Sequence, residues 1–173
     1  AASDVYKRQD YVLHIGAMVS PAADKYPEQT LYTNIGSTLN IIKAIKEQPD
    51  PDKVHFVYIG TLAETGARTY PIHWGRVGDP LNPSIFDYYA LSKVFSEMAV
   101  FDSGLKHWVS IRQTGQHPSA EGAGEEPIIF HQPANNVLEW STSIESGICM
   151  ANVCEDWVPE SFWRKGYNLS CLL

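Results

Sequence analysis

The sequence predicts an α/β protein built on an open, doubly wound parallel sheet, and two observations carry this prediction. Short apolar runs at residues 11–17, 54–60 and 108–111 are typical of strands that are buried on both faces. Segments with apolar residues at helical spacing, residues 28–47 and 87–101, alternate with these runs. Strand, helix and strand at these lengths form right-handed βαβ units, and such units place their strands side by side in a parallel sheet.

The helix predicted at residues 28–47 is indicated by the spacing of its apolar residues and by the prolines that follow it. Its apolar side chains recur on one face of the helix, at Leu31, Ile35, Leu39, Ile42 and Ile45. Two prolines, Pro49 and Pro51, end the helix because proline has no amide hydrogen to donate. The strand at residues 54–60 then leads into Thr61. Residues 62–86 contain six glycines and prolines with little periodicity, so a long loop is expected there.

The later part of the chain has weaker signals. We expect an irregular stretch at residues 112–127, a helix at residues 135–143 and a strand at residues 148–153. A short helix at residues 159–164 and a last strand at residues 167–169 are expected to follow. Three tryptophans in this part are expected in the core rather than at a ligand: Trp140, Trp157 and Trp163.

Composition and charge exclude several classes of protein. The chain has 20 acidic and 13 basic residues, a net charge of −7, so nucleic acid is not an expected partner. No run of about 18 apolar residues is present that could cross a membrane. The 6 histidines include no i, i+4 pair, so no metal site is expected. The 3 cysteines lack C-x-x-C spacing, which indicates a reduced, cytoplasmic setting.

Tyr89 and Lys93 lie four residues apart in the predicted helix at residues 87–101, so they share one face of it. A phenol with a pKa near 10 is a poor acid-base group at neutral pH. Lowering that pKa to about 7 requires about 4 kcal/mol of preferential stabilisation of the phenolate, and a neighbouring ammonium supplies part of it. Exposed helices also carry Tyr/Lys pairs at this spacing, so other motifs must support a catalytic interpretation.

Five motifs occur in one order along residues 10 to about 170. They are DYVLHIGA at residues 10–17, NIGSTLN at residues 34–40, Thr61 before Thr65-Gly66, YALSK at residues 89–93 with Glu97, and Ile111-Arg112. In this order they resemble the extended short-chain dehydrogenase/reductase superfamily, in its NAD-dependent epimerase/dehydratase branch. The resemblance implies a Rossmann-like domain, and an enzyme that exchanges a hydride with NAD or NADP at a carbon bearing a hydroxyl.

The resemblance also assigns roles to single residues. Tyr89 is expected to be the general acid-base, and Lys93 is expected to hold the nicotinamide ribose and to lower the pKa of Tyr89. Thr61 is expected to hydrogen-bond the substrate oxygen. Gly16 and Ala17 are expected to let the backbone approach the cofactor.

Structural alternatives exist for these assignments. Thr61 could be only a β-branched strand residue, and Gly16 and Ala17 could serve only close helix–sheet packing. Asn34 is expected to have a mainly structural role. Four further side chains are candidates for shaping the substrate pocket, although ordinary loop contacts are the simpler explanation: His73, Trp74, His131 and Gln132.

The chain departs from the superfamily at its start. The superfamily opens with a strand and a G-x-x-G-x-x-G turn that seats the cofactor pyrophosphate, and this sequence has no such spacing. Residues 1–9 resemble a non-native leader, residues 10–115 are expected to form part of the NAD(P)-binding domain, and residues 116–173 part of the substrate side. The chain is therefore expected to be a fragment lacking the first β-α-β strands, inactive and with uncovered sheet edges.

The substrate and the choice between NAD and NADP stay open at the sequence level. The expected partners are a small-molecule substrate and a second copy of the chain, which would pair the helix carrying Tyr89 with the helix before it. A non-catalytic nucleotide-binding sensor or scaffold of the same superfamily is the alternative function. The joint presence of Thr61, Tyr89 and Lys93 favours the enzyme, because a sensor needs no acid-base phenol.

Overall fold

The structure is a computed structural model, and it describes residues 10–66, 81–117 and 140–169. In chain order the elements are β1 (Tyr11–His14), α2 (Ala22–Lys25), α3 (Pro27–Lys46), the 3-10 helix η1 (Pro51–Lys53), β2 (His55–Thr61), the 3-10 helix η2 (Leu62–Thr65), α4 (Tyr88–Phe101), β3 (His107–Gln113), β4 (Gly115–His117), β5 (Trp140–Thr142), α5 (Ser143–Val153), the 3-10 helix η3 (Glu160–Phe162) and β6 (Lys165–Leu169).

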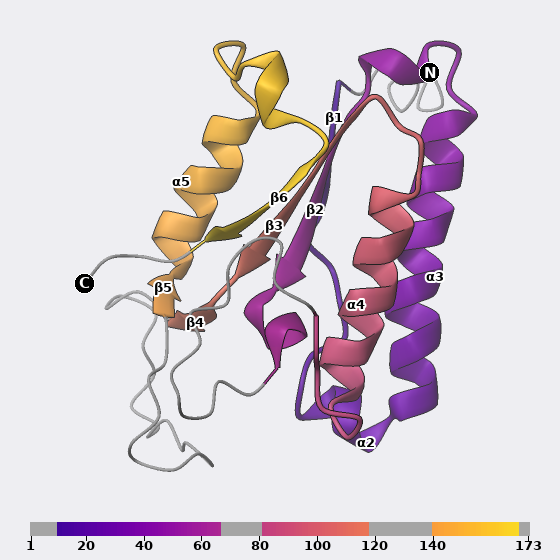
Figure 1. Ribbon diagram of the computed structural model, residues 1–173, viewed down its shortest axis with the longest axis vertical. Helices are drawn as coiled ribbons and strands as arrows, with labels where there is room; N and C mark the ends of the chain where they lie inside the picture. Colours follow the sequence, from indigo (N-terminus) through magenta and orange to yellow (C-terminus); the bar gives the residue numbers. More distant parts are fainter. Residues whose placement is uncertain (1–9, 67–80, 118–139, 170–173) are drawn as a thin grey trace, which may run out of the picture.

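Four strands form one parallel sheet in the order β1-β2-β3-β6. The register places Leu13 beside Val57, and Val57 beside Val109. Helices α3 and α4 cover one face of this sheet and α5 covers the other (Figure 1). The predicted α/β fold with an open, doubly wound parallel sheet is confirmed. Strands β4 and β5 form a separate parallel pair.

The two faces of β2 supply two separate apolar cores, because successive side chains in a strand point to opposite sides. Phe56 and Tyr58 belong to the core under α3 and α4, whose other members are Ile42, Ile45, Val54, Val100, Leu105 and Trp108. Val57 and Ile59 belong to the core under α5, whose other members are Val109, Ile111, Met150, Val153 and Trp163. Continuous apolar strands are thus explained by burial on both faces.

The prediction was wrong for the segment before β6. A helix was expected at residues 135–143, but residues 140–142 form β5, and the expected strand at residues 148–153 lies inside α5. A capping box starts α5: the Glu145 amide donates to Thr142 Oγ1 at 3.1 Å, and the Thr142 amide donates to Glu145 Oε2 at 2.9 Å. A short apolar run by itself does not distinguish a strand from a helix.

Other expectations about this part had mixed outcomes. Trp163 is buried at 4% exposure, whereas Trp157 is 68% exposed and does not belong to the core; the Trp140 side chain lies outside the described residues. The irregular stretch expected from residue 112 is not found at its start, because β3 continues to Gln113 and β4 spans Gly115–His117; residues 118–127 lie outside the described part of the chain. The last strand is confirmed, and η3 lies within the short helix that was expected before it.

The buried face of α3 is apolar at one end and polar at the other. Ile42 and Ile45 enter the core, whereas Thr30, Asn34 and Thr38 are buried near the amino-terminal end. None of the helices that the structure describes is long and apolar enough to span a membrane.

Asn34 joins three parts of the molecule. Its Nδ2 donates to the Ser92 hydroxyl of α4 at 2.8 Å and to the Met18 carbonyl at 3.0 Å, and its Oδ1 accepts from the Met18 amide at 2.7 Å. These bonds hold the loop after β1 against α3 and α4, in agreement with the structural role expected of Asn34.

We predict that Asn34→Ala lowers the free energy of unfolding by about 1–3 kcal/mol, because it leaves buried polar groups of Met18 and Ser92 without their partner. Urea denaturation measures this change. Asn40→Ala is the matched control, since Asn40 is an exposed residue of the same helix, and it should change the stability by less than about 0.5 kcal/mol. Equal effects of the two variants would contradict the role assigned to Asn34.

His14 ends β1 and is held against α3. Its Nε2 lies 3.0 Å from Thr38 Oγ1, and Thr38 donates its own hydrogen to the Asn34 carbonyl at 2.9 Å, so His14 is the donor to Thr38. Burial, and then the charge of Lys93, lower the pKa of His14 to about 4.

We predict that this histidine makes the protein acid-sensitive. Its pKa is lower in the folded state than in the unfolded state, so the unfolded state binds the extra proton, and stability falls as the pH decreases from about 6.5 to about 4. The full contribution is up to about 3 kcal/mol. Urea denaturation across this range should show a flatter pH dependence for His14→Gln than for the wild type. Parallel curves would refute the prediction.

Candidate active site

The three residues expected to act together come from two elements that meet at one end of the sheet. Thr61 is the last residue of β2. Tyr89 lies in the first turn of α4, and Lys93 lies one turn further along the helix. The carboxyl end of β2 and the amino-terminal end of α4 lie at the same end of the molecule (Figure 1). In parallel α/β sheets this is the end at which ligands bind.

The Thr61 side chain is oriented by a capping box at the start of η2. Thr61 Oγ1 accepts from the Ala63 amide at 3.2 Å, and the Thr61 amide donates to Glu64 Oε1 at 2.9 Å. Because Oγ1 accepts a backbone hydrogen, its own hydrogen can be donated elsewhere. Thr61 lies near enough to the Tyr89 side chain for its hydrogen-bonding to lower the pKa of the phenol, so the structure brings the two residues together.

The environment of Tyr89 favours the neutral phenol. Burial raises the pKa of Tyr89, and the hydrogen bond from Thr61 opposes this only in part. A negative charge on Glu64 or Asp87 raises it further. The expected lowering of this pKa by Lys93 is therefore not found in the cofactor-free chain.

Lys93 is buried below Tyr89 and is directed toward β2. Its Nζ donates to the Ile59 carbonyl and lies 4.3 Å from the centre of the Tyr58 ring, while the Tyr58 hydroxyl donates to the Lys93 carbonyl at 3.2 Å. Burial lowers the pKa of Lys93 to about 8, against the opposing charges of Glu64 and Glu97. An ammonium has three donors, of which Ile59 takes one.

A buried charged cluster lies behind these residues. Arg112 donates to both oxygens of Glu97, through Nε at 3.0 and 3.2 Å and through Nη2 at 2.8 Å, and the Ser110 hydroxyl donates to Glu97 Oε1 at 2.5 Å. Glu64 Oε2 lies 3.7 Å from Arg112 Nε. The sequence reasoning did not identify Glu64, although Thr61-x-x-Glu64 has the spacing of a capping box.

Gly16 and Ala17 follow the carboxyl end of β1, the strand next to β2. A Cβ on Gly16 would meet no atom within 4 Å, so packing inside the described chain does not require glycine at this position. This open space fits a ligand at the ends of the strands better than it fits the packing alternative. The four pocket candidates, His73, Trp74, His131 and Gln132, lie outside the described residues.

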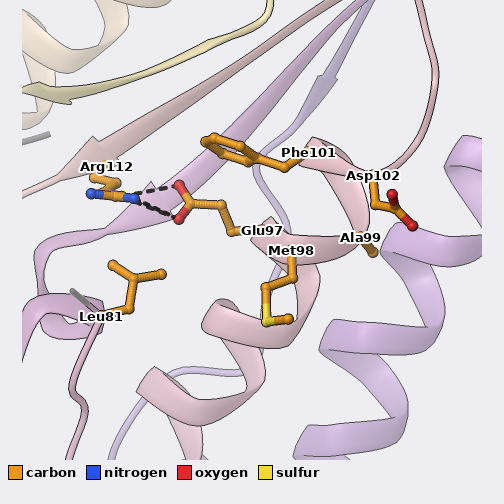
Figure 2. A pocket seen from close by; sticks show the side chains of 7 residues that line it. All are labelled: Leu81, Glu97, Met98, Ala99, Phe101, Asp102 and Arg112. Atoms are coloured by element: carbon orange, nitrogen blue, oxygen red, sulfur yellow. Dashed lines mark hydrogen bonds and ion pairs between the residues drawn. The ribbon is translucent and has the colours of Figure 1, made fainter. Parts of the chain in front are cut away.

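A pocket of about 650 Å³ lies elsewhere, at the other end of α4. Figure 2 shows the Glu97–Arg112 pair at its edge, with Met98, Phe101 and Leu81 around it. Thr61, Tyr89 and Lys93 do not line it. Within the described parts of the chain, no three side chains of His, Cys, Asp or Glu gather as a metal site would require.

Solved structures with the same fold include several nicotinamide-dependent enzymes. The dTDP-glucose 4,6-dehydratase of Bacillus anthracis, solved with NAD, has a TM-score of 0.71 and 14% identity over 93% of this chain and 51% of its own. The RMD protein of Pseudomonas aeruginosa, solved with NADPH, has a TM-score of 0.66 and 18% identity over 93% of this chain and 60% of its own. A monomeric L-threonine 3-dehydrogenase from a metagenome has a TM-score of 0.71 and 17% identity over 99% of this chain and 59% of its own.

The chain thus spans about half to three fifths of the length of these structures. No relative is found among curated protein sequences. The family model described as the NAD dependent epimerase/dehydratase family matches residues 2–113, which is more than half of the chain. By this match, and with the parallel sheet and helix order already described, the chain belongs to the NAD-dependent epimerase/dehydratase family.

Proposed function

We propose that the protein carrying this chain is an NAD(P)-dependent oxidoreductase or epimerase/dehydratase in which Tyr89 is the general acid-base. One observation carries the proposal: Thr61 at the carboxyl end of β2 and Tyr89 in the first turn of α4 come together at one end of the parallel sheet, with Lys93 one turn away. A phenol, a hydroxyl and an ammonium in this arrangement suit proton transfer at a substrate hydroxyl or carbonyl.

The chemistry follows from the hydrogen bonds of these residues. Thr61 would donate its hydroxyl hydrogen to the substrate oxygen, since its Oγ1 already accepts from the Ala63 amide. Tyr89 would take the proton from a substrate hydroxyl, or return it to a carbonyl. Burial disfavours the phenolate, so a positive charge must be present when Tyr89 acts as a base.

The described residues fit the nicotinamide end of a dinucleotide. The remaining donors of Lys93 suit ribose hydroxyls, and the open space at Gly16 leaves room for close approach. Bound NAD(P) would supply hydride acceptance and return at the carbon bearing the substrate hydroxyl. A glycine-rich turn for the pyrophosphate is not found in the sequence, so we expect the isolated chain to bind the cofactor weakly and to be inactive.

The proposed substrate is a small molecule with a secondary hydroxyl. Relatives of known structure include a UDP-N-acetylglucosamine 4-epimerase of Methanobrevibacter ruminantium, solved with UDP-N-acetylmuramic acid. A sugar nucleotide is therefore one member of the class that we propose. The cytoplasmic location stays a prediction.

We predict that Tyr89→Phe lowers the turnover number by about 10²–10⁴-fold, because the variant has no proton to exchange. The rate is followed through the absorbance of the reduced nicotinamide, in a protein that joins this chain to a glycine-rich cofactor turn. NAD(P) binding, followed by quenching of tryptophan fluorescence, should change by less than about threefold.

Tyr88→Phe is the matched control, since Tyr88 precedes Tyr89 in the same helix, and it should keep the wild-type turnover number. Unchanged turnover in Tyr89→Phe would refute the catalytic role. If the wild type and both variants bind the cofactor and none of them shows turnover, the non-catalytic sensor is favoured.

We also propose that two copies pair through α3 and α4. These helices expose large apolar side chains, among them Tyr32 of α3 at 76% and Phe95 of α4 at 56%. Such side chains on two adjacent helices suit a four-helix interface.

We predict that light scattering gives the mass of a dimer for the wild type and of a monomer for Phe95→Glu, because a carboxylate in an apolar interface is costly. Ile148→Glu is the control on α5, on the opposite face of the sheet, where Ile148 is also exposed. It should leave the dimer intact. A monomeric wild type, or loss of the dimer in both variants, would exclude this interface.

A further inference from the structure

Glu64 is a carboxyl group at 0% exposure, placed between Thr61 and a complete ion pair. Its Oε1 accepts from the Thr61 amide at 2.9 Å. Its Oε2 lies 3.7 Å from Arg112 Nε, which is beyond hydrogen-bond distance. Within the described residues, Oε2 receives no hydrogen bond from any donor.

The neighbouring guanidinium is already engaged by another carboxylate. Arg112 makes a bidentate contact with Glu97 through Nε and Nη2, and the Ser110 hydroxyl is a third donor to that carboxylate. The Glu97–Arg112 pair is therefore neutral before Glu64 is counted. An ionised Glu64 would place a second buried carboxylate beside a guanidinium that Glu97 already engages, which is costly.

Glu64 and Glu97 lie close enough for each to shift the pKa of the other. Two carboxyl groups this close are less costly to bury when one of them carries a proton. Burial and then the charge of Glu97 raise the pKa of Glu64 to about 9, whereas the donors around Glu97 lower the pKa of Glu97 despite its burial. Of the two carboxyl groups, Glu64 is therefore the one that carries the proton.

The site around Glu64 is tightly packed. A Cβ added to Gly60 of β2 would lie 3.1 Å from Glu64 Oε1, 3.1 Å from Arg112 Cγ and 3.2 Å from Ser110 Oγ. Titratable groups reach Glu64 from three elements: Tyr58 of β2, Tyr89, Lys93 and Glu97 of α4, and Arg112 of β3.

We propose that Glu64 is a positioning residue of the candidate active site, held as a neutral carboxylic acid whose Oε1 accepts from the Thr61 amide. It fixes the end of β2 so that the Thr61 hydroxyl faces Tyr89. As a neutral group it also keeps a negative charge away from the phenol, whose ionisation a nearby carboxylate would oppose. The positioning role rests on the proposed function, whereas the protonation state does not.

The protonation state is tested with this chain and Glu64→Gln. Glutamine has the shape of the neutral acid, it carries no charge, and it can still accept from the Thr61 amide. A carboxyl whose pKa is raised on folding stabilises the protein fully only below its unfolded pKa, near 4.3, and this stabilisation is lost as the pH rises toward the folded pKa. Glu64→Gln removes this dependence.

Urea denaturation measures the folding equilibrium constants of both proteins. The ratio of the Glu64→Gln constant to the wild-type constant should grow about tenfold per pH unit between about pH 5 and pH 8. A ratio that stays constant or decreases with pH would show that Glu64 is ionised in the folded protein, and would overturn the proposal.

A second measurement needs no variant. In the wild-type chain labelled with carbon-13 at the glutamate carboxyl groups, one resonance should keep the chemical shift of a protonated acid at pH 7, while the exposed glutamates have already titrated. If every glutamate resonance has the shift of a carboxylate at pH 7, the proposal fails even where Glu64→Gln does not fold.

The positioning role is tested by comparing Glu64→Ala with Glu64→Gln. Amide exchange at Thr61 should accelerate at least tenfold in Glu64→Ala and should return toward the wild-type rate in Glu64→Gln. In the active protein, Glu64→Ala should lower kcat at least tenfold with little change in KM, and glutamine should recover most of that loss.

The two proposals fail in different ways. If Tyr89→Phe abolishes turnover while Glu64→Ala retains it, only the positioning role is wrong. If Tyr89→Phe retains turnover, the proposed function is wrong, and the pH dependence of folding still decides the protonation state of Glu64.

Discussion

The ion pair between Glu97 and Arg112 determines how α4 lies on the sheet. Glu97 is one turn of helix from Lys93 and two turns from Tyr89, so a bond that holds Glu97 to β3 also sets the rotation of the helix about its axis. A buried ion pair adds little stability relative to an apolar pair, but it tolerates few alternative packings. The orientation of the two candidate site residues therefore depends on a contact that touches neither of them.

A second set of polar contacts holds the other side of α4. Asn34 binds the Ser92 hydroxyl, and the Ser96 hydroxyl donates to the Ser92 and Asn34 carbonyls at 2.8 and 3.2 Å. Small residues at positions 92 and 96 let α3 approach α4 closely. The helix is thus fixed by directional bonds on both sides, and the apolar core below it supplies the non-directional part of the stability.

The parallel sheet brings the candidate site residues to one edge of the molecule. Its strands all end on the same side, so Thr61 and the loop after β1 are gathered at one edge without any local sequence signal for their proximity. The fold by itself does not name a reaction. The hydroxyl and phenol at that edge, with an ammonium beneath them, are the groups on which the proposed proton transfer depends.

The sequence by itself determined the parallel strands, the two long helices and the spacing of Tyr89 and Lys93, because these depend on local periodicity and on proline and glycine positions. It did not separate β5 from α5, since a short apolar run suits either a strand or a helix. Only the tertiary structure decided that Trp157 is exposed and that Glu64 is buried beside Glu97. The burial of a polar side chain depends on partners that are distant in sequence, here Glu97 and Arg112, and no local pattern of residues encodes their meeting.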